Sequence, residues 1–352
     1  MTIKDIAREA NVSPGTVDRV IHNRPGVSAR TRARIQEILE KHNFQRNLLA
    51  STLAYKKKYR IAVLVPSYES DTDFWFEPDR GIKSAIEEVK KYGVVVHNYY
   101  FDKLDLHSFN KALDQILELN PDGVVFAPFF FNTSLEFTRE LGRRQIPFLF
   151  INIDIDSQKR LTFIGQDAYK GGYMAGKLLN LVSEYPHQIA IAKSKNVDNH
   201  HAIEARIKGF LDYYSNNHIE STIKEVYFNQ FSGEETKKVL DRELKGMPIK
   251  GIFVPTSMSF HIARYLKGNR LSSVHLVGFD AHANNLKYLK TGIIDFLIDQ
   301  DPLEQGYMGV KVMFEYLLFK KTPKKIYHSA INIVTKENSE FFRNPKAAEI
   351  VA

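Results

Sequence analysis

The chain has 352 residues, of which 43% are hydrophobic. This length is too great for one compact core and predicts two or three domains. It contains no cysteine, so disulfides, cysteine-ligated zinc and thiol catalysis are excluded. Residues 1–60 hold 13 Lys or Arg against 5 Asp or Glu, and their net charge of +8 equals that of the whole chain. An N-terminal block that carries all the excess positive charge predicts a polyanionic partner, which is usually nucleic acid.

The sequence shows neither a membrane segment nor a familiar catalytic motif. The N-terminus becomes charged at Lys4, and no apolar run approaches the roughly 20 residues that span a bilayer. We therefore expect a cytoplasmic protein with no membrane partner. The motifs GxGxxG, GxxxxGKS/T, HExxH and GxSxG do not occur, so we expect neither an enzyme nor a bound cofactor or metal.

The first 46 residues predict three short helices. The first has its apolar residues at helical spacing, and Thr2 is placed as its N-cap. Ser13 is placed to cap the second helix, with Pro14 at its first position, and Ser28 is placed to cap the third. Two short helices joined by a tight turn form a helix-turn-helix unit, whose second helix enters the major groove of DNA.

That geometry predicts which side chains face DNA. Arg19 is the expected base reader, because its planar fork matches guanine O6 and N7; the alternative is a phosphate contact or a solvated surface. Thr16 is expected to contact phosphate, whereas Val17 and Val20 are expected in the core. The residues predicted to contact DNA in this unit are Thr2, Ser13, Pro14, Gly15, Thr16, Asp18 and Arg19.

Several short segments of this unit match one known family in order and spacing. They are residues 2–7 (TIKDIA), 12–17 (VSPGTV), 19–20 (RV), 27–28 (VS) and 31–32 (TR). Together they resemble the headpiece of the lac repressor (LacI/GalR) family. The resemblance implies a transcription regulator, with repression as the favoured sign. It also implies a homodimer on a near-palindromic double-stranded operator, because two headpieces must meet two half-sites.

One residue departs from the family pattern. Asp18 stands where the family usually has serine. An acid near phosphates is repelled unless it accepts a hydrogen bond from cytosine N4 or pairs with a neighbouring arginine. We therefore expect an operator preference that differs from the family's commonest one.

Residues 47–54 (NLLASTLA) correspond, by this resemblance, to the family's hinge helix, which folds on operator DNA. Leu53 occupies the position of a leucine that is pushed into a minor-groove step, and Asn47 and Ala50 are predicted to contact DNA beside it. The alternative is a linker helix that packs its leucines on the next domain. We assign 1–46 to the headpiece and 47–59 to the hinge helix and linker.

From residue 60 onward, strand and helix patterns alternate. Regular alternation predicts parallel, doubly wound sheets, and the length predicts two of them. Strands are expected near 61–65, 94–100, 124–127, 147–151, 188–192, 250–254 and 274–278. Helices are expected near 81–92, 106–119, 133–145, 168–184, 202–218, 233–246 and 257–268.

This part resembles the periplasmic sugar-binding-protein fold that the same family uses as its sensor. The matching segments include Gly81-Ile82 opening the first helix, Asp122-Gly123, Gly171-Gly172, Gly209-Phe210 and Val277 to Asp280. The resemblance implies an α/β domain of type I with two lobes. We place the first lobe at 60–164 and 299–325, the second at 165–298 and 326–336, and a tail at 337–352. The tail has no leucine heptad, so no coiled-coil tetramer is expected.

In that fold a ligand binds between the lobes, at the carboxyl ends of the strands. Asp280 follows a strand and could accept two hydroxyls or cap the next helix. Arg206 could hold a hydroxyl, carboxylate or phosphate with its fork, or form an interlobe salt bridge. Gln300 matches the family's closing glutamine.

Other predicted ligand residues rest on position alone. Phe74 and Trp75 follow the first strand, where they could stack on a sugar ring or form a hydrophobic plug. Asn152 stands where the family often has Asp or Arg, Gln166 where Ser or Thr is common, and Thr256 where many relatives have Asn. The resemblance implies a carbohydrate effector; a nucleoside, polyol or sugar acid stays open.

Two other classes of protein remain as alternatives. A solute-binding protein for sugar transport fits the two lobes, but the basic headpiece and the missing signal segment oppose it. An α/β enzyme with a DNA-binding appendage is the second, and no residues can be assigned to its chemistry.

Overall fold

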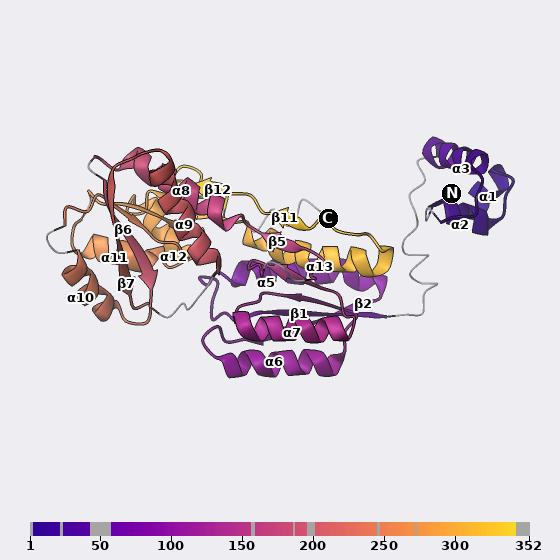
Figure 1. Cartoon of the computed structure of the whole chain (residues 1–352), viewed down its shortest axis with the longest axis horizontal. Helices are drawn as coiled ribbons and strands as arrows, with labels where there is room; N and C mark the ends of the chain where they lie inside the picture. Colours follow the sequence, from indigo (N-terminus) through magenta and orange to yellow (C-terminus); the bar gives the residue numbers. More distant parts are fainter. Residues whose placement is uncertain are drawn as a thin grey trace. The chain divides into compact units, whose positions relative to one another are not determined.

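The computed structural model describes residues 3–21, 24–42, 58–155, 159–185, 187–195, 201–244, 247–271 and 273–342. By its internal contacts the chain divides into a small helical unit at the N-terminus and a large α/β unit (Figure 1). Across these described ranges, no helix combines the length and the apolar character that a membrane crossing requires.

The N-terminal unit consists of α1 (Ile3–Glu9), α2 (Pro14–Ile21) and α3 (Ala29–Lys41). Two predicted caps are confirmed, because Ser13 Oγ accepts from the Thr16 amide and Ser28 Oγ from the Thr31 amide, each at 3.2 Å. The predicted cap Thr2 lies outside the described residues. The three helices enclose a small apolar core of Ile6, Ala7, Ala10, Val17, Val20, Ile35 and Ile38.

The large unit contains two six-stranded sheets. The first is built from β1 (Tyr59–Pro66), β2 (Val94–Phe101), β3 (Gly123–Phe126), β4 (Phe148–Ile151), β5 (Phe163–Gly165) and β11 (Ile326–His328). Its strand order is β11-β5-β4-β3-β1-β2, and every neighbouring pair is parallel. This is the predicted doubly wound arrangement.

The second sheet contains β6 (His187–Ser194), β7 (Ser221–Phe228), β8 (Gly251–Phe253), β9 (His275–Phe279), β10 (Phe296–Asp299) and β12 (Asn332–Val334). Its order is β12-β10-β9-β8-β6-β7. All its pairs are parallel except β10 with β12, which is antiparallel.

Helices cover both faces of each sheet (Figure 1). The first sheet carries α6 (Leu106–Leu119) and α7 (Phe131–Arg143) on one face, and α5 (Phe76–Val89) and α13 (Pro302–Phe319) on the other. The second lies between α8 (Ala168–Val182) with α9 (His201–Asn216), and α10 (Gly233–Glu243) with α11 (Ser259–Gly268) and α12 (Ala283–Lys290). Both faces of the central strands are therefore buried, which explains their continuous apolar runs.

Glycines let paired helices approach closely. A Cβ on Gly81 in α5 would stand 1.9 Å from the carbonyl oxygen of Leu303 in α13. A Cβ on Gly172 in α8 would stand 1.8 Å from the carbonyl oxygen of Arg206 in α9. The expectation that Gly81 opens its helix is wrong: α5 begins at Phe76, and Gly81 serves the contact with α13.

The C-terminal strand also differs from the prediction. We expected 326–336 to lie wholly in the second lobe, but β11 pairs with β5 in the first sheet and only β12 joins the second. The chain therefore crosses between the lobes at 329–331, after its earlier crossings at 166–167 and 300–301. Short strands separated by three residues give no composition signal for which sheet each one joins.

Candidate functional site

The predicted DNA-reading surface of α2 is accessible. Ser13, Pro14, Gly15 and Arg19 are exposed. Val17 and Val20 lie in the core of the unit, as the helical spacing predicted. Contact between these exposed side chains and DNA stays a prediction. The same holds for Thr2, Asn47, Ala50 and Leu53, which lie outside the described residues.

Asp18 has a basic partner within the unit. Its Oδ2 accepts from Arg24 Nη1 at 3.5 Å, with side-chain exposures of 38% and 59% for the two residues. An exposed pair of this length contributes little to stability. It does place a positive charge beside the unusual acid, which is one of the two conditions under which an acid is tolerated near phosphates.

Several predicted ligand residues of the large unit lie around the turn that follows β9. Asp280 adopts a left-handed conformation with φ of 67°, which ends the strand sharply. The Asn285 side chain holds this turn, since its Nδ2 donates to the carbonyl oxygens of Phe279 and Asp280, each at 2.9 Å. The turn is therefore fixed by a buried amide.

The Asp280 carboxylate is 4% exposed and accepts from Gln300 Nε2 at 2.8 Å. Burial raises the pKa of Asp280 to about 7; the nearby Arg206 opposes this shift and Asp299 adds to it. A carboxyl group with such a pKa exchanges its proton near neutrality, as groups in binding clefts often do.

Arg206 lies on α9 and is 7% exposed. Its Nη1 donates to the Pro255 carbonyl at 3.0 Å, and its guanidinium carbon lies 3.8 Å from the centroid of the Phe279 ring. Its Nε has no hydrogen-bond partner among the described residues. Burial lowers the pKa of Arg206, and the charge of Asp280 acts against this. The interlobe salt bridge considered for Arg206 is not formed with any residue that the structure describes.

Asn152 links the first lobe to the crossing segment at Gln300. It follows β4 in the first lobe, and its Nδ2 donates to Gln300 Oε1 at 3.1 Å and to Gln305 Oε1 at 3.2 Å. Because Gln300 also donates to Asp280, one hydrogen-bonded chain runs from the first lobe to the second. The amide at position 152, where the family often has Asp or Arg, supplies both donors.

In the described part of the protein, no hydrogen bond joins the remaining predicted ligand residues to the network of Asn152, Gln300 and Asp280. The Trp75 ring is 4% exposed and packs edge-on against Phe74, with centroids 5.3 Å apart. Thr256 is 8% exposed and accepts from the Met258 amide at 3.3 Å. Gln166 instead donates to backbone carbonyls at the lobe crossings. Their contact with an effector stays a prediction.

Three residues of this site were missed from the sequence. Phe279 was read only as a strand residue, yet its ring supports the Arg206 guanidinium. Asn285 and Gln305 act through amide hydrogen bonds to the Asp280 turn and to the Gln300 segment. A polar residue just inside a helix that follows a site loop is the signal that could have suggested both.

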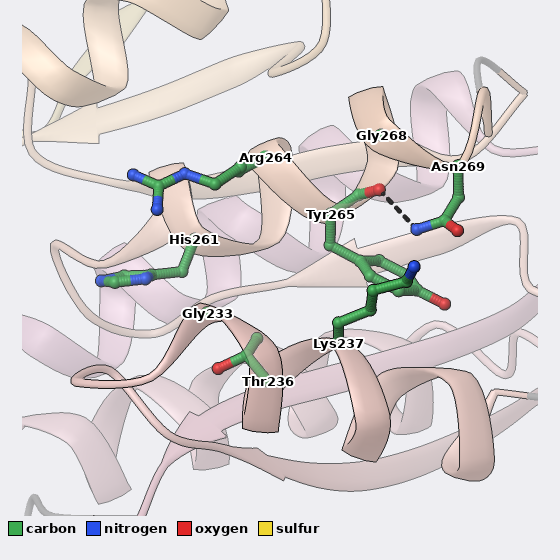
Figure 2. A pocket seen from close by; sticks show the side chains of 8 residues that line it. All are labelled: Gly233, Thr236, Lys237, His261, Arg264, Tyr265, Gly268 and Asn269. Atoms are coloured by element: carbon green, nitrogen blue, oxygen red, sulfur yellow. Dashed lines mark hydrogen bonds between the residues drawn. The ribbon is translucent and has the colours of Figure 1, made fainter.

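A separate hollow lies between α10 and α11 (Figure 2). It has a volume of about 200 Å³ and is lined by Gly233, Thr236, Lys237, His261, Arg264, Tyr265, Gly268 and Asn269. Burial lowers the pKa of His261 to about 4, so this ring is neutral at pH 7. None of its lining residues is Asp280, Arg206, Gln300 or Asn152, and no pattern in the sequence predicted this hollow.

The chain matches two family descriptions. Residues 2–47 match the bacterial regulatory proteins of the lacI family, and residues 61–321 match the periplasmic binding protein domain. Catabolite control protein A of Priestia megaterium is 27% identical over 290 residues, which cover 80% of this chain and 82% of that protein. The HTH-type transcriptional regulator DegA of Bacillus subtilis is 26% identical over 279 residues, covering 73% and 80%.

A solved structure from Bacteroides fragilis, assigned as a LacI transcriptional regulator, is 29% identical with a TM-score of 0.75. It covers 82% of this chain and 100% of its own. Fold and site thus define a DNA-binding transcription regulator whose larger unit is an effector-binding domain of the periplasmic-binding-protein type. The chain belongs to the LacI family of bacterial regulators and carries its periplasmic binding protein domain.

Proposed function

We propose that this regulator binds a sugar or sugar derivative between its lobes at Asp280 and Arg206, and that binding changes its affinity for a near-palindromic operator. The observation that carries the proposal is the buried pair itself. Asp280 offers a carboxylate to hydroxyl donors, and Arg206 keeps a buried Nε donor that no described residue pairs with. A few convergent polar groups in an otherwise apolar cleft are what fix the orientation of a sugar.

Coupling to DNA requires a ligand that binds two lobe arrangements with different affinities. The chain from Asn152 through Gln300 to Asp280 supports such coupling. A ligand hydroxyl that donates to Asp280 competes with the Gln300 amide, which is also bonded to the first lobe. Occupancy of the site would therefore alter a contact between the lobes.

A thermal-shift screen tests the effector site. The purified full chain would be heated with neutral sugars, sugar acids, sugar phosphates, polyols and nucleosides. We expect one class to raise the midpoint in a saturable way, because a ligand that binds only the folded state stabilises it. Asp280→Asn should lose the shift, while Asp114→Asn, a change on the exposed face of α6, should keep it. A shift that survives in Asp280→Asn would contradict the site.

Operator binding is tested separately by fluorescence anisotropy. Deleting residues 1–58 should abolish binding to operator DNA and leave the thermal shift intact, since the charged headpiece is then absent. Leu53→Gly should weaken specific binding and spare effector binding, because it removes the proposed apolar wedge. Equal operator affinity in Leu53→Gly would disprove the wedge.

A homodimer is part of the same proposal. Edge strands of both sheets carry exposed apolar side chains, with Val95 and Tyr100 on β2 and Tyr227 on β7, followed by Phe231, which is 63% exposed. An edge strand with apolar side chains is a surface on which a second chain can pair or pack. Sedimentation velocity should give a dimer, and Phe231→Ser should shift it towards monomer. A monomeric wild-type chain that binds full operator with high affinity would overturn this part.

A further inference from the structure

The three chain crossings between the lobes meet at one side chain. Gln166 follows β5 at the first crossing. Its Nε2 donates to the carbonyl oxygen of Asp299, at the end of β10, and to that of Ala330, between β11 and β12, each at 3.2 Å. The side chain is 5% exposed. A single amide thus links the first crossing to both of the others.

Backbone contacts join the same segments in pairs. The Ser329 amide donates to the Gly165 carbonyl at 3.0 Å, which connects the third crossing to the first. Asp299 is paired with Asn332 in the antiparallel ladder of β10 and β12, which connects the second to the third. Gln166 adds a side-chain link from the first crossing to the second, the pair that neither of these backbone contacts joins.

The Gln166 amide oxygen, opposite the two Nε2 contacts, lies against Gly171 of α8. Oε1 is buried and has no hydrogen-bond partner among the residues that the structure describes, and it lies 2.8 Å from where a Cβ on Gly171 would stand. A buried carbonyl left unpaired costs about 1–3 kcal/mol. The two hydrogen bonds that Nε2 donates, and the absence of a side chain at Gly171, offset this cost. A Cβ at position 171 would displace this oxygen.

We propose that Gln166 is a positioning residue that selects the observed angle between the lobes, and that it acts on the backbone crossings instead of on an effector. Gln166 follows β5 of the first lobe, whereas Asp299 ends β10 of the second, so a rotation that moves β5 relative to β10 changes the distance from Nε2 to the Asp299 carbonyl oxygen. Loss of the amide removes this restraint. Its effect on effector and operator affinity rests on the proposed function, but its effect on the lobe angle does not.

The absence of native cysteine makes a direct measurement possible. Lys111→Cys on α6 and Lys177→Cys on α8 place one spin label on each lobe, at exposed positions. Electron–electron double resonance would then give the distance distribution in the effector-free protein, diluted with unlabelled chain to suppress signals between subunits. The test variant is Gln166→Met, which keeps the length and removes the amide. The control is Gln188→Met, whose amide makes an exposed 3.4 Å contact with Thr222.

We expect Gln166→Met to shift or broaden the distance distribution, and Gln188→Met to superimpose on the unsubstituted labelled protein. A distribution unchanged by Gln166→Met overturns the proposal, whatever the ligand screen gives. If that variant does not fold, Gly171→Ala displaces the amide from the α8 side and should produce the same shift. Its control is Gly268→Ala, where an added Cβ meets nothing within 4 Å. An unchanged distribution in folded Gly171→Ala would equally overturn it.

Discussion

Gln300, at the second crossing between the lobes, is hydrogen-bonded to Asp280 in the turn after β9. Gln300 Nε2 donates to Asp280 Oδ1 at 2.8 Å. The other end of the same amide accepts from Asn152 at 3.1 Å. The orientation of the Gln300 amide is therefore determined at both ends, because turning it over would place oxygen against the Asp280 carboxylate and nitrogen against the Asn152 donor. The Gln300 side chain therefore contacts both the Asp280 carboxylate and a residue of the first lobe.

The first prediction concerns the pH dependence of stability. Burial raises the pKa of Asp280 from 3.8 to about 7, so between these values the folded protein keeps a proton that the unfolded chain has lost. The free energy of unfolding contributed by this group therefore falls as pH rises through that window. Asp280→Asn cannot ionise and so does not lose this free energy of unfolding. We expect its melting midpoint to exceed that of the wild type by several degrees at pH 8.

At pH 4 the same variant should melt close to the wild type, because Asp280 is then largely protonated in the folded protein. Calorimetric midpoints at both pH values, with the surface change Asp114→Asn as the control, measure this difference. A variant that is less stable than the wild type at pH 8 would show that the ionised carboxylate stabilises the fold, contrary to the direction of its pKa.

The sequence predicted the fold and the helices of the N-terminal unit better than it predicted the contacts around Asp280. The spacing of apolar residues and the capping residue Ser13 correctly predicted α2 and its buried valines. Both signals depend on residues that are close together in the sequence. The cleft depends on residues that are distant in the chain. Asn152 contacts Gln300 across 148 positions, and Gln166 contacts Ala330 across 164. No local pattern encodes these partners. The sequence therefore suggested which residues belong to the site, but not the hydrogen bonds that they form.

The second prediction tests the glycine contacts between helices. A Cβ on Gly306 in α13 would stand 2.0 Å from the carbonyl oxygen of Pro78 in α5. Backbone cannot move aside cheaply, so we expect Gly306→Ala to lower the free energy of unfolding by about 1–3 kcal/mol, as overpacking does. Gly142→Ala on α7 is the control, because its Cβ meets nothing within 4 Å. That change should stabilise by about 0.4–1 kcal/mol. Equal effects of the two substitutions in urea unfolding would contradict the packing argument.

The third prediction concerns Asp18 in α2, the helix that we expect to contact DNA. Asp18→Ser removes a negative charge and releases Arg24 from its 3.5 Å contact. We expect tighter non-specific DNA binding and a steeper salt dependence, by about one phosphate contact, because an additional cation can neutralise the backbone. Anisotropy titrations at several salt concentrations measure the slope. Glu37→Gln, an exposed change on α3, removes the same charge without freeing Arg24 and should leave the slope nearly unchanged. Identical slopes for both variants would assign the effect to net charge alone.

The fourth prediction concerns a contact that spans the lobes. Phe131 begins α7 in the first lobe and His201 begins α9 in the second, and their ring centroids lie 4.6 Å apart at an interplanar angle of 59°. An aromatic pair in such a tilted arrangement contributes about 0.5–1.5 kcal/mol beyond its area. Because the two rings belong to different lobes, this energy stabilises the observed lobe arrangement and not the interior of either lobe.

We therefore expect Phe131→Ala to weaken binding of an effector that favours this arrangement by about 2- to 13-fold, mainly through faster dissociation. The melting midpoint of the effector-free protein should change little. His201→Ala should have a similar effect, and the double variant should be no weaker than the stronger single one, since both remove the same contact. Phe341→Ala, at a ring that is 73% exposed, serves as the control. Stopped-flow dissociation rates measure these differences, and additive effects of the two substitutions would show that the rings act independently.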